Sequence, residues 1–192
     1  MPNAETHPLS PFLPAGARLL MLGSFPPPRA RWSMEFYYPN LQNDMWRIFG
    51  VAFFDNKDYF LVAGLKIFDK QRIAEFCEQR GIALSDVAVS AVRAKGNASD
   101  QFLEIVERRD IGTLLGQIPE CHAIVTTGQK ATETLLAATG AAEPAVGGFT
   151  EFEFAGRAMR HWRMPSSSRA YPKPLAEKAA EYEAMFRREG LL

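Results

Sequence analysis

The sequence predicts an α/β domain of three layers, in which helices cover both faces of a four-stranded, mainly parallel sheet. Two observations predict it. Short apolar segments alternate along the chain with amphipathic segments of helical period, and this alternation favours parallel strands. The length of 192 residues also fits one compact domain. We expect a single domain over residues 1–192, with residues 1–16 as an irregular, proline-rich lead-in.

The first half of the chain contains two predicted strands and two predicted helices. Met45, Ile48 and Phe49 lie at helical spacing, and Asp69 and Gly81 have the residue types that begin and end a helix. The predicted elements are a strand over 17–23, a helix over 43–54, a helix over 69–81 and a strand over 82–89.

The second half continues the alternation. A helix is predicted over 99–109, with Ser99 as its cap and Phe102, Ile105 and Val106 facing inward. It is followed by a strand over 121–128, a helix over 129–140, a hairpin over 147–165 that leads into a fourth core strand, and a closing helix over 173–190.

Composition excludes several classes of protein. No apolar run approaches the roughly 18 residues that span a membrane, and the N-terminus lacks the pattern of a secretory signal. Zero net charge argues against a protein that coats nucleic acid through bulk charge. Cys77 and Cys121 are expected to be buried free thiols. We therefore expect a cytoplasmic protein without a metal or another cofactor.

In a parallel sheet, ligands bind in the loops beyond the carboxyl ends of the strands. Here those loops follow Gly23, Val89, Thr127 and Met164. Basic residues without intervening acids flank the first and last of these loops and predict a positive rim. They are Arg18, Arg29 and Arg31 near the first loop, and Arg157, Arg160, Arg163, Arg169 and Lys173 near the last.

The residue types in these two loops suit a nucleic-acid strand with one base drawn out of it. Serine hydroxyls and backbone amides bind phosphate oxygens, and Phe36, Tyr37 and Tyr38 offer flat faces for a base. Each feature also has a purely structural interpretation. The aromatic cluster is more often core packing, and a Pro-Ser-Ser-Ser run is usually a flexible turn.

Three segments of the sequence resemble the uracil-DNA glycosylase superfamily, most closely its hypoxanthine-DNA glycosylase branch. The segments "LGSFPP…FYYPNLQNDMWRI", "GIALSDVAVSAVRAKGNASD" and "MPSSSRAYP" are similar to its motifs, in order, over most of the chain. The resemblance implies a DNA glycosylase of base-excision repair, which hydrolyses the N-glycosidic bond of a flipped, deaminated base. It implies the same three-layer fold and DNA as the partner, and we expect a monomer.

The sequence also departs from the family pattern. Phe25 occupies the position at which most branches have a catalytic Asp or Asn, and Met164 occupies that of a base-contacting histidine. The hypoxanthine branch uses an asparagine further along, and the matching residue is Asn43. Asn40 stands at the family's histidine position, and His161 is expected to point away from Met164.

The resemblance assigns roles to three groups of residues. They are Asn43 and Asn40 for positioning the attacking water; Gly23, Ser24, Phe25, Tyr37, Tyr38 and Asp86 for the base; and Pro165, Ser166, Ser167, Ser168 and Arg169 for the DNA. Either asparagine can instead cap the following helix, with Asn40 the better placed, and Asp86 can instead be a structural acid.

No lysine occurs in the two pocket-forming motifs at either end, so we expect hydrolysis without a strand-cleaving lyase step. The excised base stays open among uracil, hypoxanthine, xanthine and mismatched thymine. Motifs for a nucleotide-binding enzyme or a serine hydrolase are missing from the sequence. The remaining alternative is a catalytically silent nucleic-acid-binding module of the same fold.

Overall fold

The structure, a computed structural model, describes residues 3–93 and 102–192. Its main sheet has five strands in the order β3-β2-β6-β8-β7. They are β2 (Leu19–Gly23), β3 (Ile82–Asp86), β6 (Ala123–Thr126), β7 (Gly148–Phe154) and β8 (Arg157–Arg163). The pairs β3–β2, β2–β6 and β6–β8 are parallel, which confirms the parallel core of the sheet.

The predicted number of strands was wrong by one. The segment 148–154 is the outer arm of the predicted hairpin, and it stays paired with β8 from Gly148 opposite Arg163 to Phe154 opposite Arg157. Ala155 and Gly156 form the tight turn with φ values of 52° and 75°. The sheet therefore has a fifth strand, which is antiparallel to its neighbour.

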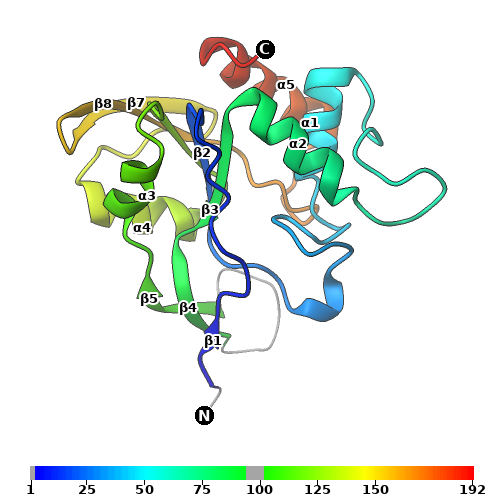
Figure 1. The fold of residues 1–192 in the computed structure, drawn as a ribbon, viewed down its shortest axis with the longest axis horizontal. Coiled ribbons are helices and arrows are strands. Elements are labelled where there is room, and N and C mark those ends of the chain that lie inside the picture. Colours follow the sequence, from blue (N-terminus) through cyan, green and yellow to red (C-terminus); the bar gives the residue numbers. More distant parts are fainter. Residues whose placement is uncertain (1–2, 94–101) are drawn as a thin grey trace.

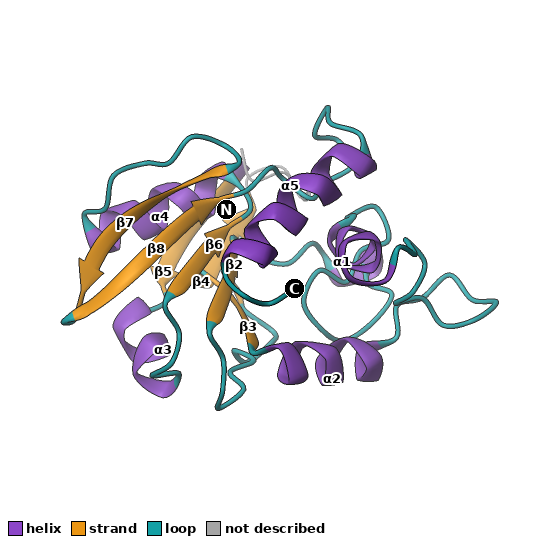
Figure 2. Ribbon diagram, turned by 90° about the horizontal axis from the view of Figure 1, so that it is seen from above, coloured by secondary structure: helices purple, strands orange, loops and turns teal. Residues whose placement is uncertain are grey.

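Helices lie on both faces of this sheet (Figure 2). One layer contains α1 (Met45–Phe54), α2 (Lys70–Arg80) and α5 (Leu175–Arg188), and the other contains α3 (Ile111–Gln117) and α4 (Gln129–Thr139). Alternate residues of β2 pack into the hydrophobic cores on the two faces of the sheet. Leu19 and Met21 pack against the first layer of helices, and Leu20 and Leu22 pack against the second. The three-layer arrangement agrees with the sequence prediction. No helix in the described residues is long and apolar enough to cross a membrane.

A second, smaller sheet was not predicted. It consists of β1 (Glu5–Thr6), β4 (Ala88–Arg93) and β5 (Leu103–Arg108), with β4 in the middle. The helix predicted over 99–109 is wrong, because β5 pairs antiparallel with β4. The inward-facing residues of β5 recur with a period of two, as in a strand. Val106, which was expected to face inward, is 58% exposed. Ser99, its expected cap, lies outside the described residues. The short helix α3 was also missed.

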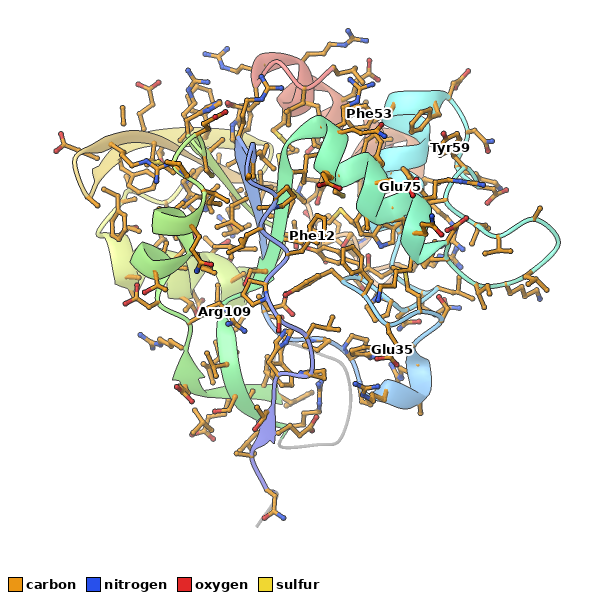
Figure 3. The ribbon with its side chains drawn as sticks, in the orientation of Figure 1. Phe12, Glu35, Phe53, Tyr59, Glu75 and Arg109 are labelled. Atoms are coloured by element: carbon orange, nitrogen blue, oxygen red, sulfur yellow. The ribbon has the colours of Figure 1, made fainter. Side chains whose placement is uncertain are left out.

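The N-terminal segment is ordered against the edge of the main sheet. Phe12 exchanges two backbone hydrogen bonds of 2.9 Å with Leu84 of β3, and the amide of His7 donates to the carbonyl of Val89 at 2.8 Å. Figure 1 shows this segment running beside β3 and β4, and Figure 3 labels Phe12 on it. The lead-in expected to be irregular thus includes β1 and covers β3.

Candidate functional site

A cavity of about 740 Å³ lies at the carboxyl ends of the parallel strands. Its wall is formed by the last residues of β2 and β3 and by residues that follow β2, β6 and β8 in the chain, as the fold rule predicts. Among the described residues, the loop expected after Val89 does not contribute to this wall. Of the residues assigned roles from the sequence, all but Pro165 line it. They are Gly23, Ser24, Phe25, Tyr37, Tyr38, Asn40, Asn43, Asp86, Ser166, Ser167, Ser168 and Arg169.

Two distant segments are joined at the rim of this cavity. We call residues 38–44 the asparagine loop and residues 165–171 the serine loop. The amide of Asp44 donates to the carbonyl of Ser167 at 2.8 Å, and the amide of Arg169 donates to the carbonyl of Gln42 at 3.1 Å. Asn43 and Ser168 stand opposite each other as a short antiparallel bridge. Backbone hydrogen bonds therefore fix the two loops relative to each other.

The two asparagines of the asparagine loop are both held by backbone groups. The Oδ1 atom of Asn43 accepts from the amide of Met45, the first residue of α1, at 2.9 Å. That of Asn40 accepts from the amide of Gln42 at 3.0 Å. The expectation that Asn40 is the better helix cap is therefore wrong, because Asn43 makes the bond to the helix. Each side chain keeps its orientation through this bond and still lines the cavity.

The three aromatic residues differ in their surroundings. Phe36 and Tyr37 belong to the buried core, and the hydroxyl of Tyr37 donates to the carbonyl of Ser10 at 3.0 Å. Burial, and secondly the charge of Asp86, raise the pKa of Tyr37 above its ordinary value, so it remains neutral. Tyr38 is only half-buried and has φ of 51°, a backbone conformation that few residues other than glycine adopt. This strained backbone accompanies a ring beside the cavity, where strain often marks function.

Asp86 ends β3 beside the last residue of β2. A Cβ atom added to Gly23 would lie 2.4 Å from its Oδ1 atom, so a glycine is needed for this close approach. The other oxygen, Oδ2, lies 2.8 Å from Nε2 of His7. Arg109, labelled in Figure 3, donates from Nε to the main-chain carbonyl of Asp86 at 3.2 Å. The contact with His7 has no signal in the sequence, because His7 lies 79 positions away in the lead-in.

The serine loop contains two local turns. The Oγ atom of Ser166 accepts from the amide of Ser168, and that of Ser168 accepts from the amide of Ala170, each at 3.2 Å. The hydroxyl hydrogens of Ser166 and Ser168 are not used in these two bonds. Ser167 is buried, and the carbonyl of Pro165 accepts from the hydroxyl of Tyr182 at 2.9 Å. This bond connects Pro165 to α5, and Pro165 does not line the cavity.

A buried carboxylate connects the two loops through side chains. Oδ1 of Asp44 accepts from Nε of Arg169 at 2.9 Å and lies 3.5 Å from Arg47. Nζ of Lys178 lies 4.0 Å from Oδ2 and donates to the carbonyl of Ser168 at 2.8 Å. Burial lowers the pKa of both Arg47 and Lys178. Three cations and one carboxylate leave a local excess of positive charge beside the serine loop.

The predicted positive rim is smaller than expected. Of the basic residues that suggested it, only Arg31 and Arg169 line the cavity. All six of the others are paired with acids or carbonyls: Arg29 with Glu35, Arg160 with Glu189, Arg163 with Glu143, Lys173 with Glu181, Arg18 with the carbonyl of Gly190, and Arg157 with carbonyls including that of Leu115. The tertiary fold brings these partners close. A stretch of sequence without acids therefore did not reveal that its basic residues are paired.

His161 lies in a buried network away from the cavity. Its Nε2 atom lies 2.9 Å from Oγ1 of Thr126, which lies 2.8 Å from Oγ1 of Thr132. Met164 belongs to the core on the other face of the sheet, as its spacing from His161 predicts. His161 does not line the cavity.

Sequence reasoning missed several residues of the cavity wall. Thr127 and Gly128 line it from the end of β6, and Gln42 and Tyr171 line it from the asparagine loop and the serine loop. The position of Thr127 and Gly128 after a predicted strand was an available signal. The contribution of Tyr171 depends on how the serine loop folds back, which the sequence does not reveal.

Comparison with solved structures finds 14 similar chains. One is the solution NMR structure of a "putative Uracil DNA glycosylase" from Methanosarcina acetivorans, with a TM-score of 0.64 and 25% sequence identity. The similarity covers 94% of this chain and 96% of that chain. No protein-family model and no curated protein matches the sequence. The likeness supports the resemblance to the uracil-DNA glycosylase superfamily, whereas the hypoxanthine branch stays a prediction.

Proposed function

We propose that this protein is a DNA glycosylase that hydrolyses the N-glycosidic bond of a deaminated base, uracil or hypoxanthine, flipped out of DNA. One observation carries the proposal: backbone hydrogen bonds join the asparagine loop to the serine loop at the rim of one cavity. A base inside the cavity would have an amide side chain near its sugar and serine hydroxyls near its phosphates. The structural likeness to a protein whose structure is described as that of a "putative Uracil DNA glycosylase" supports the same function.

The cavity suits a single base. Its volume of about 740 Å³ falls within the range of small-molecule sites, which is roughly 300–1,000 Å³. In this proposal the ring of Tyr38 stacks on the base, and backbone amides near Ser24 bind a base carbonyl. Stacking on an aromatic face offsets part of the free energy needed to remove the base from the duplex.

Asn43 positions the attacking water. Its amide does not titrate, so it orients a water molecule rather than abstracting a proton. The Oδ1 atom already accepts from the amide of Met45, which fixes the side chain, and its second lone pair is available to a water. Orientation of this kind lowers the barrier without a strong base when the departing base is a good leaving group. Asn40 is the second candidate for this role.

The serine loop binds the DNA backbone. Hydroxyls of Ser166 and Ser168 donate to phosphate oxygens, and Arg169 adds a positive charge at the exposed edge of the loop. In the free protein, Arg169 is paired with Asp44. Its entry into the gap left by the flipped base would therefore break or lengthen this ion pair. The reaction is a simple hydrolysis that leaves an abasic site.

A panel of oligonucleotides tests the function. Single- and double-stranded DNA carrying one uracil, hypoxanthine, xanthine or mismatched thymine is incubated with the protein and then treated with alkali. We expect alkali-dependent cleavage at the altered base only, and an intact strand without alkali. A catalytically silent module would instead shift the DNA in a gel without producing alkali-labile sites on any member of the panel, and that result would refute the proposal.

A further inference from the structure

We infer that His7, from the N-terminal segment, is a positioning residue for Asp86, and that the pair makes the site select bases with a ring N–H at the position that faces Asp86. This inference rests on the proposed function and extends it to the choice of base. It adds the N-terminal segment to the functional site, although no motif in the sequence points there.

The contact between His7 and Asp86 is buried and well supported. The side chain of His7 is 1% exposed and that of Asp86 is 8% exposed. His7 is held by its backbone bond to Val89 and by ring contacts, edge-on with Phe25 at 5.3 Å and tilted to Tyr37 at 6.1 Å. A histidine fixed in this way holds one oxygen of the carboxylate in one place.

The hydrogen bonds of His7 indicate which group donates. A carboxylate oxygen accepts hydrogen bonds, so we assign Nε2 of His7 as the donor in its 2.8 Å contact with Oδ2. Nδ1 of His7 lies 2.9 Å from the carbonyl oxygen of Leu9 and 3.1 Å from its amide, so these contacts hold the other side of the ring. His7 therefore binds Oδ2, and Oδ1 lies on the Gly23 side, where Asp86 lines the cavity.

This geometry selects bases by the chemistry of one ring nitrogen. Uracil and hypoxanthine carry a hydrogen on the ring nitrogen next to the carbonyl, whereas cytosine and adenine carry a lone pair there. A carboxylate oxygen accepts from the first pair and repels the lone pair of the second. A buried site built around such a bond strongly rejects an analogue that cannot form it. The pair thus favours deaminated bases over their normal parents.

The test compares excision of a base with excision of its N-methylated form, uracil against N3-methyluracil and hypoxanthine against N1-methylhypoxanthine. The methylated base has no ring N–H and cannot use Asp86 in any variant. His7→Phe keeps the ring packing but removes the donor, and His7→Gln keeps an amide donor. We expect His7→Phe to lower kcat/KM for the unmethylated base by about tenfold or more, as for the loss of a charge-assisted hydrogen bond.

The ratio between the two substrates separates positioning from a structural role. We expect this ratio to fall in His7→Phe and to be largely restored in His7→Gln. An equal loss on both substrates, or no loss, would overturn the inference. Thermal melting checks folding, and His7→Leu replaces His7→Phe if the latter does not fold.

A second measurement does not depend on activity. The ¹⁵N chemical shifts of the His7 ring report whether Nε2 is hydrogen-bonded, and we expect them to change in Asp86→Asn. Unchanged shifts would show that the contact is absent and would overturn the inference. If the wild-type protein releases no base from any oligonucleotide, the proposed function fails and base selection fails with it, while the shifts still report on the pair.

Discussion

Arg169 donates from Nε to Oδ1 of Asp44 at 2.9 Å, and this bond joins the serine loop to the residue that precedes α1. Asp44 is also the acid nearest to Arg47 and Lys178. Asp44→Asn removes the carboxylate that pairs with these three cations while keeping the side-chain shape. We expect the free energy of unfolding to fall by about 1–3 kcal/mol, as for loss of a charge-assisted hydrogen bond, measured by urea denaturation.

The matched control for this change is Arg29→Gln. Arg29 and Glu35 form an ion pair whose side chains are 60% and 59% exposed, so solvent screens it. Its loss is expected to cost less than about 1 kcal/mol. Equal effects of the two substitutions would show that the cluster around Asp44 does not stabilise the loops.

Asn43→Ala is expected to reduce turnover by about 100-fold or more, because the attacking water loses its orienting group. The unfolding free energy should also fall by about 1 kcal/mol, because Asn43 binds the first amide of α1. DNA affinity should remain. Single-turnover excision and gel-shift titration measure the two effects. Asn40→Ala is the comparison. A larger loss of turnover in that variant would assign the positioning of the water to Asn40 instead of Asn43.

Arg169→Ala is expected to weaken binding to duplexes of every sequence and to reduce the salt dependence of binding by about one phosphate contact. Fluorescence anisotropy at several salt concentrations gives both values. Arg187→Ala is the control, because Arg187 pairs with Glu183 on α5 and does not line the cavity. Identical salt slopes for the two variants would place Arg169 off the DNA interface.

Gly23→Ala should impair excision, because the new methyl group would meet Oδ1 of Asp86 at 2.4 Å and displace the carboxylate. Gly16→Ala is a matched control on the same chain segment, since nothing lies within 4 Å of its added Cβ. We expect normal excision and melting temperature for Gly16→Ala. Full activity of Gly23→Ala would mean that the position of Asp86 does not matter for catalysis.

His161 should make stability depend on pH. Thr132 donates to the carbonyl of Gly128, so Thr126 donates to Thr132 and accepts from Nε2 of His161. This leaves the buried Nδ1 without a hydrogen-bond partner in the described part of the chain. Burial, with a smaller effect of Arg163, lowers the pKa of His161 from 6.5 to about 4. The unfolded chain therefore binds more protons between these values, and stability falls as pH drops from 6.5 to 4, by up to about 3 kcal/mol.

His161→Gln tests this assignment, because the amide still donates to Thr126 but does not titrate. Urea denaturation at pH 7, 5.5 and 4.5 should show a smaller loss of stability in the variant than in the wild type. The same pH dependence in both proteins would assign the effect to other groups.

The sequence predicted the parts of the fold that local patterns determine. Asp69 accepts from the amide of Arg72 at the start of α2, and Gly81 ends this helix with φ of 70°, as residue types alone indicated. β5 was mistaken for a helix because Phe102, Ile105 and Val106 happen to fit a helical period. Pairing with β4 then decided the conformation, and such long-range pairing has no local signal.

The candidate site shows the same division. The cavity at the strand ends follows from the topology of the sheet. The sequence alone therefore predicts that Gly23, Asp86 and the serine loop lie close together. The side-chain partners of the site residues could not be predicted in this way. The pairing of His7 with Asp86 and that of Arg169 with Asp44 each connect segments whose separation in the chain hides the contact.

The two edges of the five-stranded sheet are both protected, and this affects how copies of the protein meet. β3 is covered along its outer side by the segment around Phe12, and β7 carries the exposed residues Glu151 and Glu153. A covered edge and a charged edge both oppose the addition of a strand from a second molecule. Self-association by extension of this sheet is therefore disfavoured.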